Sequence, residues 1–590
     1  MTGMDFDIVV CGAGMAGSTL CRQLRRELPD ASIACIDPIA RPLPDACHKV
    51  GESTVELATH YLAQVLDLES YLREDHILKN GLRFFPGGGA THSLAERTEI
   101  GPPQLPIVPS FQLDRGRLEN DLRAMNEADG VQLFEGAKVT AVDLAPGDAP
   151  HTIALSGPEG AKRTLRARWF VDATGRRQLL ARKLGLRRST DHLARAAWFR
   201  VGERVDVAEL VPPSDTAWHE RDRTHIRWQS TVHFMGEGYW AWLIPLSSGF
   251  TSVGIVVDGD IHPFEAIHTE AQARAFLAEH EPEVAARLAE PPARDFRCYR
   301  EYSYGAERVF SPDRWALVGE AGTFVDPFYS PGSDYIALAN TYATRLIRED
   351  LTTGDATNAD RFSEWYLRLF DESVVTFRHM MGAFGNPAVM TAKIYWDNLQ
   401  YWSFLCQLFF QRAQELPLDH QQEVLDEGIE FTRSHRRAQA LFRAWHDLGG
   451  VTLGEARNVY LPPIPSILAN AYLDLQKRVE PAELLPLLRT KRALTEEVLG
   501  ELVLRVLREL PEEAGRTLAR DLELATWELP IESRRLTLDD LSPRDRRRAL
   551  SSVAKDVERC LGKPTPRDDV ASWEAHYRAC LDRDVTDVAL

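Results

Sequence analysis

The segment from Trp315 to Asn340 has the composition of an anion-binding site. Its sequence, WALVGEAGTFVDPFYSPGSDYIALAN, predicts a strand, a loop marked by glycine and proline, and a helix that starts near Ser333. The first turn of a helix carries free backbone N–H groups and a partial positive charge. We therefore expect this segment to hold an anion or to stabilise a developing negative charge.

A glycine-rich turn near the N-terminus predicts a dinucleotide-binding site. The run FDIVVC at 6–11 is followed by GAGMAG, by a helical pattern over 18–27, and by a second strand at 32–36 that leads into an aspartate. Glycines in this context permit a tight turn and the close approach of a pyrophosphate, and the acidic residue accepts hydrogen bonds from a ribose. A purely structural glycine turn is the alternative. The residues expected to contact the dinucleotide are Gly12, Ala13, Gly14, Ala16, Gly17 and Asp37.

Four further segments favour FAD over a nicotinamide cofactor. They are VGEST at 50–54, QLDRGRL at 112–118, WFVDATG at 169–175 and GEA at 319–321. With these segments the chain resembles, over about residues 5–345, the FAD-dependent monooxygenase superfamily, in which an ATG-ended strand and a GEA-type segment contact the flavin. The resemblance implies further FAD contacts from Glu52, Ser53, Arg117, Asp172, Gly175, Gly319, Glu320 and Asp326.

Three signatures narrow the resemblance to the flavin-dependent halogenases, the branch of the tryptophan halogenases and their phenol- and pyrrole-halogenating relatives. WAWLIP at 240–245 matches WxWxIP, FVDPFYSPG at 324–332 matches FxxPxxSxG, and residues 50–54 match GE(A/S)T. The period of two places both tryptophans on one face of a strand, as half-buried strand residues. The resemblance implies that they wall the space between flavin and substrate. The expected wall residues are Trp240, Trp242, Ile244 and Pro245.

Lys79 stands where the halogenases carry a lysine shortly after the GE(A/S)T loop. The resemblance implies that this lysine activates hypohalous acid, either by donating a hydrogen bond to it or by forming a haloamine. A solvated surface lysine is the alternative, and Lys49 and Arg83 are then the next candidates.

The resemblance also implies the co-substrates and one partner. Reduced FAD, O2 and a halide, chloride or bromide, together give the hypohalous acid. The sequence has no second strand–GxGxxG–helix unit for NAD(P)H, so we expect a separate NAD(P)H-dependent flavin reductase to reduce the FAD. No metal site is expected.

Tyr329 and Pro331 depart from the family pattern. Tryptophan halogenases have a glutamate where this chain has Tyr329, and a tyrosine is not a carboxylate base near neutral pH. This favours a phenol, a pyrrole or another activated carbon over free tryptophan, with Tyr329 either a catalytic residue or a packing aromatic. Pro331 has no N–H to offer a halide. The candidate halide donors are therefore Ser330, Gly332 and Ser333.

The predicted fold class is α/β, with a para-hydroxybenzoate-hydroxylase-like FAD domain around a Rossmann-type βαβ core, an antiparallel β-sheet substrate domain and an all-α C-terminal extension. We expect the FAD domain at 1–190 and 300–348, with 80–110 contributing to the substrate side, the antiparallel sheet at 191–299 and the helical domain at 349–590.

One helical pattern in the C-terminal extension is apolar nearly all round. Over residues 394–410, apolar side chains recur at spacings of three and four and also cover much of the remaining surface. Such a helix is buried. It either roofs the main core or lines an apolar substrate channel.

Length and charge limit the class of protein. At 590 residues the chain should form two or three domains, and a net charge of -18 argues against nucleic acid or an anionic membrane as a partner. The RDRRR run at 544–548 is interpreted as the solvated first turns of a helix. Eight scattered cysteines without CxxC pairs indicate reduced thiols, and no apolar run is long enough for a transmembrane segment. We therefore expect a cytoplasmic protein.

The further expected partners are a substrate and a second copy of the chain, and two other functions are compatible with the sequence. A small-molecule or carrier-protein-bound substrate is expected, and assembly as a homodimer is compatible with the sequence. The alternatives are a flavin-dependent monooxygenase or oxidase that hydroxylates an aromatic or lipid-like substrate, and a non-catalytic flavin-binding partner protein. A halide-dependent product mass would separate the first two functions, and a lack of turnover would favour the third.

Overall fold

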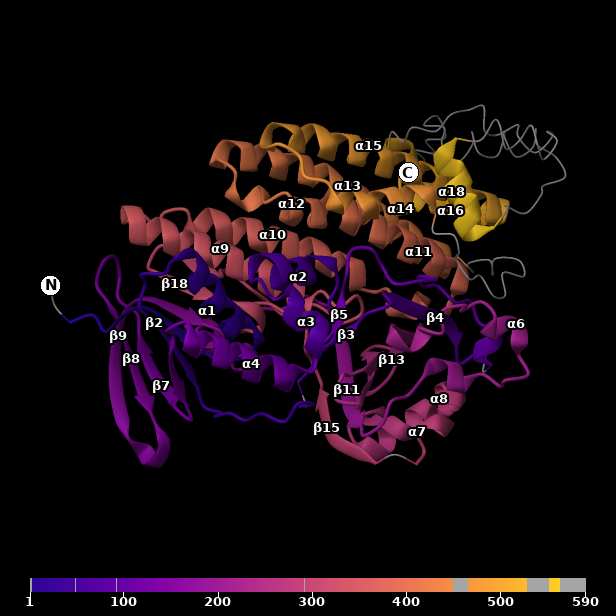
Figure 1. Ribbon diagram of the computed structural model, residues 1–590. Coiled ribbons are helices and arrows are strands. Elements are labelled where there is room, and N and C mark those ends of the chain that lie inside the picture. The colour runs from indigo at the N-terminus through magenta and orange to yellow at the C-terminus, as the bar shows by residue number, and fades with distance from the viewer. Residues whose placement is uncertain are drawn as a thin grey trace, which may run out of the picture.

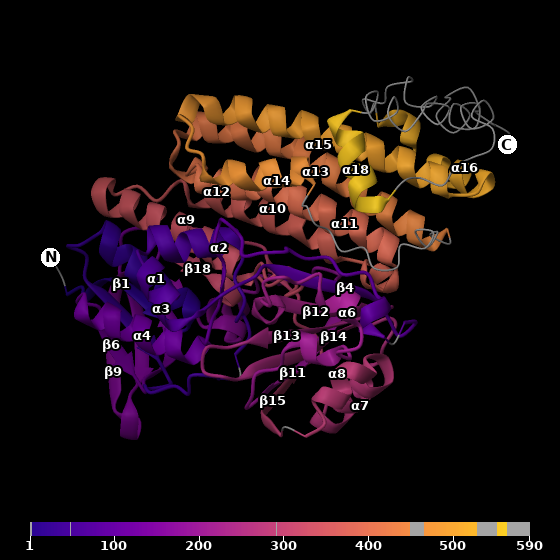
Figure 2. The same cartoon turned by 45° about the vertical axis from the view of Figure 1, so that its right-hand side comes forward.

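A computed structural model describes residues 3–47, 49–91, 93–290, 292–448, 465–527 and 551–562 (Figure 1). Two β-sheets lie side by side, and a layer of long helices covers both of them (Figures 1 and 2). The arginine-rich run at 544–548, which is predicted to open a helix, lies outside the described residues.

The first sheet has a parallel core whose strands end at one common edge. Its strand order is β17 (Phe310–Ser311), β18 (Trp315–Leu317), β9 (Lys162–Asp172), β1 (Phe6–Cys11), β2 (Ile33–Asp37) and β6 (Gln132–Glu135); β7 (Lys138–Asp143) and β8 (His151–Ser156) extend it from β9. β1 pairs in parallel with β2 and β9, and β9 pairs in parallel with β18. The carboxyl ends of β1, β9 and β18 therefore bring the GAGMAG, ATG and GEA segments to the same edge.

Three helices complete this α/β unit. They are α1 (Met15–Glu27), α4 (Arg115–Ala128) and α9 (Gly332–Thr353), and α1 packs against both of the others. α9 begins one residue before the predicted start, and Gly354, in a left-handed conformation with φ +78°, ends it. The apolar strands of the parallel core are buried, as expected for a covered parallel sheet.

The second sheet has six strands and is antiparallel except at one edge. Its order is β15 (Ala293–Tyr299), β11 (Ala194–Val201), β14 (Thr251–Asp258), β13 (Tyr239–Pro245), β12 (Thr231–Gly236) and β4 (Leu82–Gly88). The five strands between residues 194 and 299 are antiparallel to their neighbours, as predicted. β4, from the 80–110 segment, pairs in parallel with β12. A short two-stranded sheet, β3 (Ile77–Leu78) with β5 (Phe111–Gln112), and helix α2 (Glu56–His60) lie near this edge.

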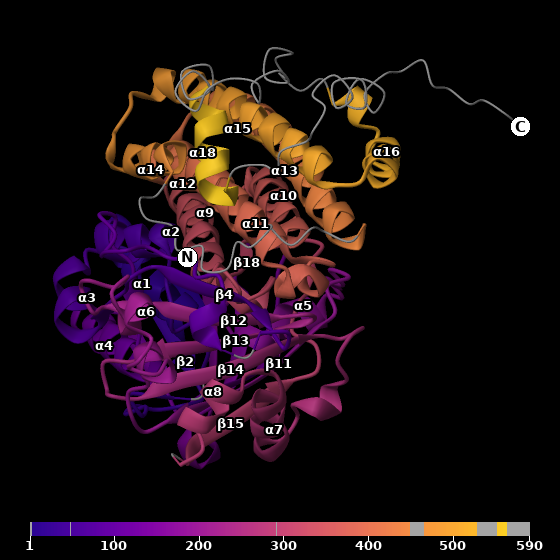
Figure 3. The same cartoon turned by 90° about the vertical axis from the view of Figure 1, so that its right-hand side faces the viewer.

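Long helices form the layer above the sheets (Figure 3). Their bounds are α10 (Ala359–Phe377), α11 (Pro387–Gln400), α12 (Cys406–Phe410), α13 (Leu418–Asp447), α14 (Ser466–Leu473), α15 (Pro481–Glu509), α16 (Glu512–Asp521) and α18 (Ser552–Leu561). The π-helical turn η10 (Tyr401–Leu405) joins α11 to α12, so the apolar pattern over 394–410 is one helical stretch interrupted by a π turn. None of the described helices is long and apolar enough to cross a membrane.

Candidate active site

The glycine turn after β1 fits the pyrophosphate of a dinucleotide. A side chain on Gly17 would place its Cβ 1.8 Å from the Gly12 carbonyl oxygen, whereas a Cβ on Gly14 would meet nothing closer than 3.9 Å. Gly12 and Gly17 are therefore required for the turn itself, and Gly14 leaves open space in front of α1. No side chain caps the N-terminus of α1, so its first N–H groups face that space. The Ala13 N–H donates a 2.7 Å hydrogen bond to Asp37, which fixes the carboxylate beside the turn.

The GEA segment packs directly against the glycine turn. Gly319 has φ +57°, and a Cβ there would lie 2.8 Å from the Cβ of Ala16. Glu320 follows, 3.9 Å from Arg176, and burial raises the pKa of its carboxyl group. The two segments that the resemblance assigns to FAD are thus in contact across the edge of the first sheet.

Three carboxylates predicted to bind FAD are already engaged with protein groups. Glu52 is buried and forms an ion pair with Arg200, with a shortest distance of 2.6 Å. Asp172 accepts hydrogen bonds from the Thr174 hydroxyl and N–H and from the Leu180 N–H. These contacts fix the loops around the site.

Asp326 is likewise engaged. It accepts hydrogen bonds from the Tyr302 hydroxyl at 2.6 Å and from the Phe328 N–H at 2.8 Å, and its other contact is His192 at 2.7 Å. The carboxylate therefore fixes the turn that leads to Ser330. Its prediction as a cofactor ligand stays a prediction, but the contacts identify a structural role.

Arg115 lies near the motifs predicted to bind the flavin, although it was not predicted as a site residue. Burial raises the pKa of both Glu52 and Glu320, and the positive charge of Arg115 opposes both shifts, whereas the predicted Arg117 bonds to Asp75 and Asp45. Both arginines belong to the QLDRGRL segment at the start of α4, and the sequence alone could not say which one faces the site. Gly175 leaves open space, because a Cβ there would meet no atom within 4 Å.

Lys79 is completely buried in the structure. Its ammonium group donates hydrogen bonds to the Ser53 hydroxyl at 2.8 Å and to the Thr54 carbonyl at 2.7 Å. Burial lowers the pKa of Lys79 to about 7, and the negative charges of Glu56 and Asp334 oppose that shift. The lysine is therefore not a solvated surface residue. Within the described part of the chain, no carboxylate lies close enough to form an ion pair with it.

The two alternative cations have other roles. Lys49 forms an ion pair with Glu119 of α4, and Arg83 forms a buried ion pair with Glu99 at 2.5 Å. Arg83 also contacts the Pro102 carbonyl. Both contacts are structural, and neither cation lies among the described residues that line the pocket described below.

Ser53 connects Lys79 to the segment predicted to bind halide. The Ser330 hydroxyl lies 3.0 Å from the Ser53 hydroxyl, and Ser330 has a left-handed backbone with φ +61°. Pro331 occupies the N-cap position of α9, so Gly332 and the buried Ser333 form its first turn. A left-handed non-glycine residue beside a helix N-terminus is a strained arrangement of the kind found at ligand sites.

The two tryptophans of the WAWLIP strand belong to a cluster of aromatic rings and are fully buried rather than half-buried as expected. Neither they nor Ile244 and Pro245 are among the described residues that line the pocket of the site, so their role as a wall between flavin and substrate stays a prediction. Trp240 and Trp242 project from one face of β13 with ring centroids 5.5 Å apart, and Trp240 contacts Phe328 at 5.2 Å. His233 on β12 lies between Trp240 and Phe84, and burial lowers its pKa to about 3. Ile244 and Pro245 continue the same buried strand. The cluster links the FVDPFYS loop to the second sheet.

Tyr329 bonds to a carboxylate from the helical layer. Its hydroxyl donates a 2.8 Å hydrogen bond to Asp397 of α11. Asp397 also accepts hydrogen bonds from Lys393 and from Gln439, each at 2.7 Å. Burial and the Asp397 charge raise the pKa of Tyr329 well above its usual range. The position that lacks a glutamate is therefore coupled to an aspartate supplied by a distant segment.

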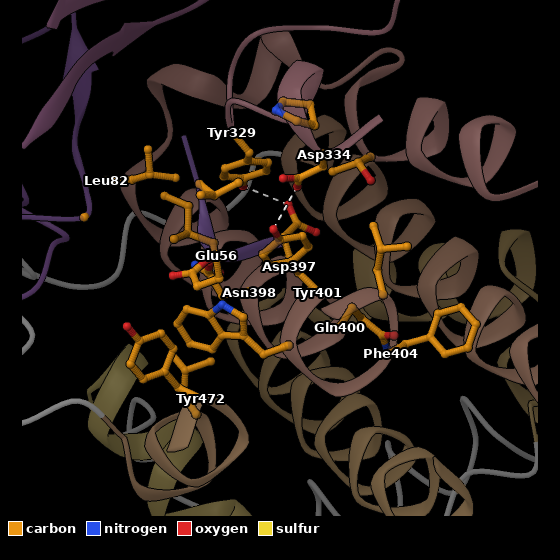
Figure 4. Close-up of a pocket in the computed structure, with 18 of the residues that line it drawn as sticks. Glu56, Leu82, Tyr329, Asp334, Asp397, Asn398, Gln400, Tyr401, Phe404 and Tyr472 are labelled. Atoms are coloured by element: carbon orange, nitrogen blue, oxygen red, sulfur yellow. Dashed lines mark hydrogen bonds between the residues drawn. The ribbon is translucent and has the colours of Figure 1, made fainter. Parts of the chain in front are cut away.

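A pocket of about 430 Å³ extends from Lys79 and Tyr329 into the helical layer (Figure 4). Its wall is predominantly apolar, and residues of α11 and η10 form a large part of it. The predicted apolar helix therefore lines a cavity as well as covering the core. Representative wall residues are Leu82, Phe84, Ile100, Ile394, Leu405 and Leu468.

None of the four described acidic residues that line the pocket was predicted from the sequence, and two of them, Asp334 and Glu56, follow recognised signatures. Asp334, in the first turn of α9, accepts hydrogen bonds from the Tyr401 hydroxyl and the Ala58 N–H, and burial raises its pKa to about 7. Glu56 opens α2, and burial raises its pKa as well. Each lies two residues beyond its signature, and that proximity was the available signal.

The chain is similar to known proteins in both its sequence and its fold. The sequence model of the tryptophan halogenase family matches residues 90–402. A flavin-dependent halogenase of Dictyostelium discoideum, chlA, is 27% identical over 468 residues, which cover 74% of each chain. A tetracycline 7-halogenase of Kitasatospora aureofaciens is 29% identical over 430 residues, covering 63% of this chain and 70% of the relative.

A carrier-protein-dependent relative and a solved structure also match. The 1H-pyrrole-2-carbonyl-[peptidyl-carrier protein] chlorinase of Pseudomonas fluorescens is 26% identical over 354 residues, 56% of this chain and 73% of its own. The crystal structure of halogenase PltM has a TM-score of 0.57 and 17% identity, covers 82% of this chain and 96% of its own, and shares the fold. Because the family model covers more than half of the sequence, this chain belongs to the tryptophan halogenase family, and it is a flavin-dependent halogenase that uses FAD, a halide and O2.

Proposed function

We propose that this halogenase transfers halogen from hypohalous acid to a phenol or a similarly activated ring, with Lys79 as the residue that activates the electrophile. The buried position of Lys79 at one end of an apolar pocket carries the proposal. Bound reduced FAD supplies, with O2, the oxidising equivalent that converts halide to hypohalous acid. The cofactor is proposed to rest its pyrophosphate on the glycine turn at 12–17.

Lys79 is suited to hold and polarise hypohalous acid. The ammonium group has three N–H donors, and the protein engages two of them, with Ser53 and Thr54. The remaining N–H is available to the oxygen of hypohalous acid. A hydrogen bond there stabilises the charge that develops on oxygen as the halogen is transferred, and such a bond is stronger in a water-poor site.

The halide is proposed to bind at the N-terminus of α9. The N–H groups of Gly332 and Ser333 belong to the first helical turn, and the Ser330 hydroxyl lies beside it. Pro331 contributes no N–H. Ser53 forms hydrogen bonds with both Ser330 and Lys79. The proposed halide site and the lysine are therefore connected through one residue.

A substrate other than free tryptophan is supported by Tyr329 and by the pocket wall. The Tyr329 hydroxyl is a donor to Asp397 and cannot act as a carboxylate base. Free tryptophan would also bring an ammonium and a carboxylate into a mainly apolar pocket, which costs free energy unless both charges are paired. A phenol brings one polar group.

The proposed partners are a separate NAD(P)H-dependent flavin reductase and, for some substrates, a carrier protein. One relative is named for a carrier-bound pyrrole and another for tetracycline, so relatives accept substrates in both forms. We propose that residues 349–590 serve as the substrate-binding cover of an FAD unit at 1–190 and 300–348 and of a sheet unit at 191–299.

The test is turnover with a purified flavin reductase, NADH, FAD and either chloride or bromide. A phenol panel, free tryptophan and a carrier-bound pyrrole are compared by mass spectrometry. We expect halide-dependent mass gain with phenols and none with tryptophan. A halide-independent gain of one oxygen atom would instead identify a monooxygenase.

A further inference from the structure

One carboxylate in the pocket differs from the others in its contacts. Four carboxylates belong to the described lining residues, and Asp334, Asp397 and Glu372 each accept at least two hydrogen bonds from protein donors. Glu56 forms no ion pair with any residue in the described part of the chain. Its donors are its own backbone N–H and the Trp402 indole. Among the four pocket carboxylates it is therefore the one that no described cation holds and no described hydroxyl group caps.

Glu56 lies between the chemical end of the pocket and its apolar body. It follows Thr54, whose carbonyl accepts the Lys79 hydrogen bond, by two residues. In Figure 4 it lies between Tyr329 and Tyr472. Burial raises its pKa, and the Trp402 indole and the Lys79 ammonium lower it. A ligand group that reaches Glu56 is therefore also close to Lys79.

The other end of the pocket has an exposed apolar rim. Ile107 and Leu473 both line the pocket and are 57% and 39% exposed, respectively. The rings of Trp402 and Tyr472, with centroids 4.8 Å apart, lie on the wall that leads to the rim. An apolar substituent of a ligand that extended along this wall would be transferred from water to an apolar surface.

We propose that Glu56 binds the hydroxyl of a phenol that carries an apolar substituent, and that it accepts the phenolic proton during halogen transfer. The substituent extends toward Ile107 and Leu473. A carboxylate that accepts a hydrogen bond from a phenol makes the ring more electron-rich and hence more reactive toward an electrophile. The transfer step rests on the proposed function, whereas binding does not.

The phenolic proton moves to the Glu56 carboxylate while a ring carbon ortho or para to oxygen forms its bond to halogen and the halogen–oxygen bond breaks. The hydroxide that leaves takes a proton from the Lys79 ammonium and becomes water. The resulting dienone then loses its ring proton to the Lys79 amine, and Glu56 returns its proton to the oxygen, which gives the halophenol and restores both residues.

Binding tests the proposal without any turnover. Affinities of 4-hexylphenol and of its methyl ether, 4-hexylanisole, are measured by calorimetry on the full FAD-loaded chain and on its Glu56→Gln and Glu56→Asp variants. We expect Glu56→Gln to weaken 4-hexylphenol binding about tenfold or more, because it removes a hydrogen bond to a charged group. The affinity for 4-hexylanisole should change less than about twofold. Glu56→Asp should restore part of the phenol affinity, and unsubstituted phenol should bind the wild type at least about tenfold more weakly than 4-hexylphenol.

A matched variant and a turnover assay complete the test. Glu372→Gln changes a second pocket carboxylate, one held by Arg436, and should leave the difference between phenol and ether intact. Equal effects of Glu56→Gln on phenol and ether, or no effect on either, would overturn the proposal. If the phenol binds in a Glu56-dependent manner but yields no halogenated product with reduced FAD, O2 and bromide, the binding proposal is supported and the proposed function fails.

Discussion

The hydroxyl of Tyr329 donates a 2.8 Å hydrogen bond to the carboxylate of Asp397, which lies 68 residues further along the chain. Asp397 also neutralises the buried ammonium of Lys393. This contact joins the FVDPFYS loop at the active site to helix α11. Packing of the helical layer and the shape of the site are therefore coupled through one carboxylate.

Asp397→Ala should destabilise the protein strongly. Lys393, 1% exposed, would keep a buried charge without its partner, which costs about 3–5 kcal/mol of the free energy of unfolding. Urea unfolding followed by tryptophan fluorescence measures the loss. The double variant Asp397→Ala, Lys393→Met removes both charges and should recover a large part of it. A double variant as unstable as the single one would show that the ion pair is not the cause.

Lys79→Ala should abolish halogenation and preserve the flavin reactions. The alanine removes the N–H donors but leaves the glycine turn unchanged, so FAD binding and peroxide release should persist. Product is measured by mass spectrometry and peroxide by a coupled colour assay. Lys49→Ala is the matched control, because Lys49 is a half-buried lysine paired with Glu119, and it should retain halogenation. Halogenation by the Lys79→Ala variant would refute the assignment.

Halogenation should fall as pH rises above about 7. Burial lowers the pKa of Lys79 to about 7, so the ammonium form that donates the hydrogen bond is lost above that pH, about tenfold per unit well beyond it. Asp334, whose pKa is raised to about 7, titrates in the same window. The initial rate between pH 6 and 9 gives the profile, and Asp334→Asn separates the two groups. A flat profile in both proteins would contradict an ammonium donor.

Two glycines in one turn should respond differently to alanine. Gly17→Ala forces a Cβ against the Gly12 carbonyl and should lower the melting temperature markedly, with loss of FAD. Gly14→Ala meets open space, so its melting temperature without FAD should match the wild type within a degree or two. Its FAD affinity, measured by flavin fluorescence, should nevertheless fall, because the methyl group takes the space proposed for the pyrophosphate. Unchanged affinity would move that site elsewhere.

Tyr472→Phe should loosen the loop at the pocket rim. The Tyr472 hydroxyl bonds to both the N–H and the carbonyl of Val108, at 2.9 and 2.6 Å. Without it, amide exchange over residues 104–109 should accelerate, and KM for 4-hexylphenol should rise several-fold with little change in kcat. Hydrogen exchange followed by mass spectrometry measures the first effect and steady-state kinetics the second. Unchanged exchange would mean that packing alone holds the loop.

Local patterns in the sequence predicted much of the fold. The strands expected at 6–11 and 32–36 are β1 and β2, and the helix expected near Ser333 begins at Gly332. The parallel pairing of β4 with β12 could not be predicted, because it joins segments about 150 residues apart and no local pattern encodes a partner at that distance.

The sequence predicted the site residues that belong to a family signature. It did not predict those that only tertiary contacts bring to the site. Lys79 and Ser330 were identified by position, and the structure joins both to Ser53. Asp397 and Glu56 have no signature of their own. A carboxylate on an apolar helix face or beside a loop gains a role only when folding removes it from water, and a linear sequence does not record that burial.

The helical wall of the pocket gives the enzyme two regions that can change at different rates. The residues proposed for halide and oxidant lie before residue 335, whereas α11, η10 and α14, which supply a large part of the apolar wall, lie after residue 386. Selection for a new substrate can therefore act on the second region while the first is held constant. A directed-evolution library confined to wall positions such as Ile394, Leu405 and Leu468 should yield variants of altered substrate range that keep their halide preference.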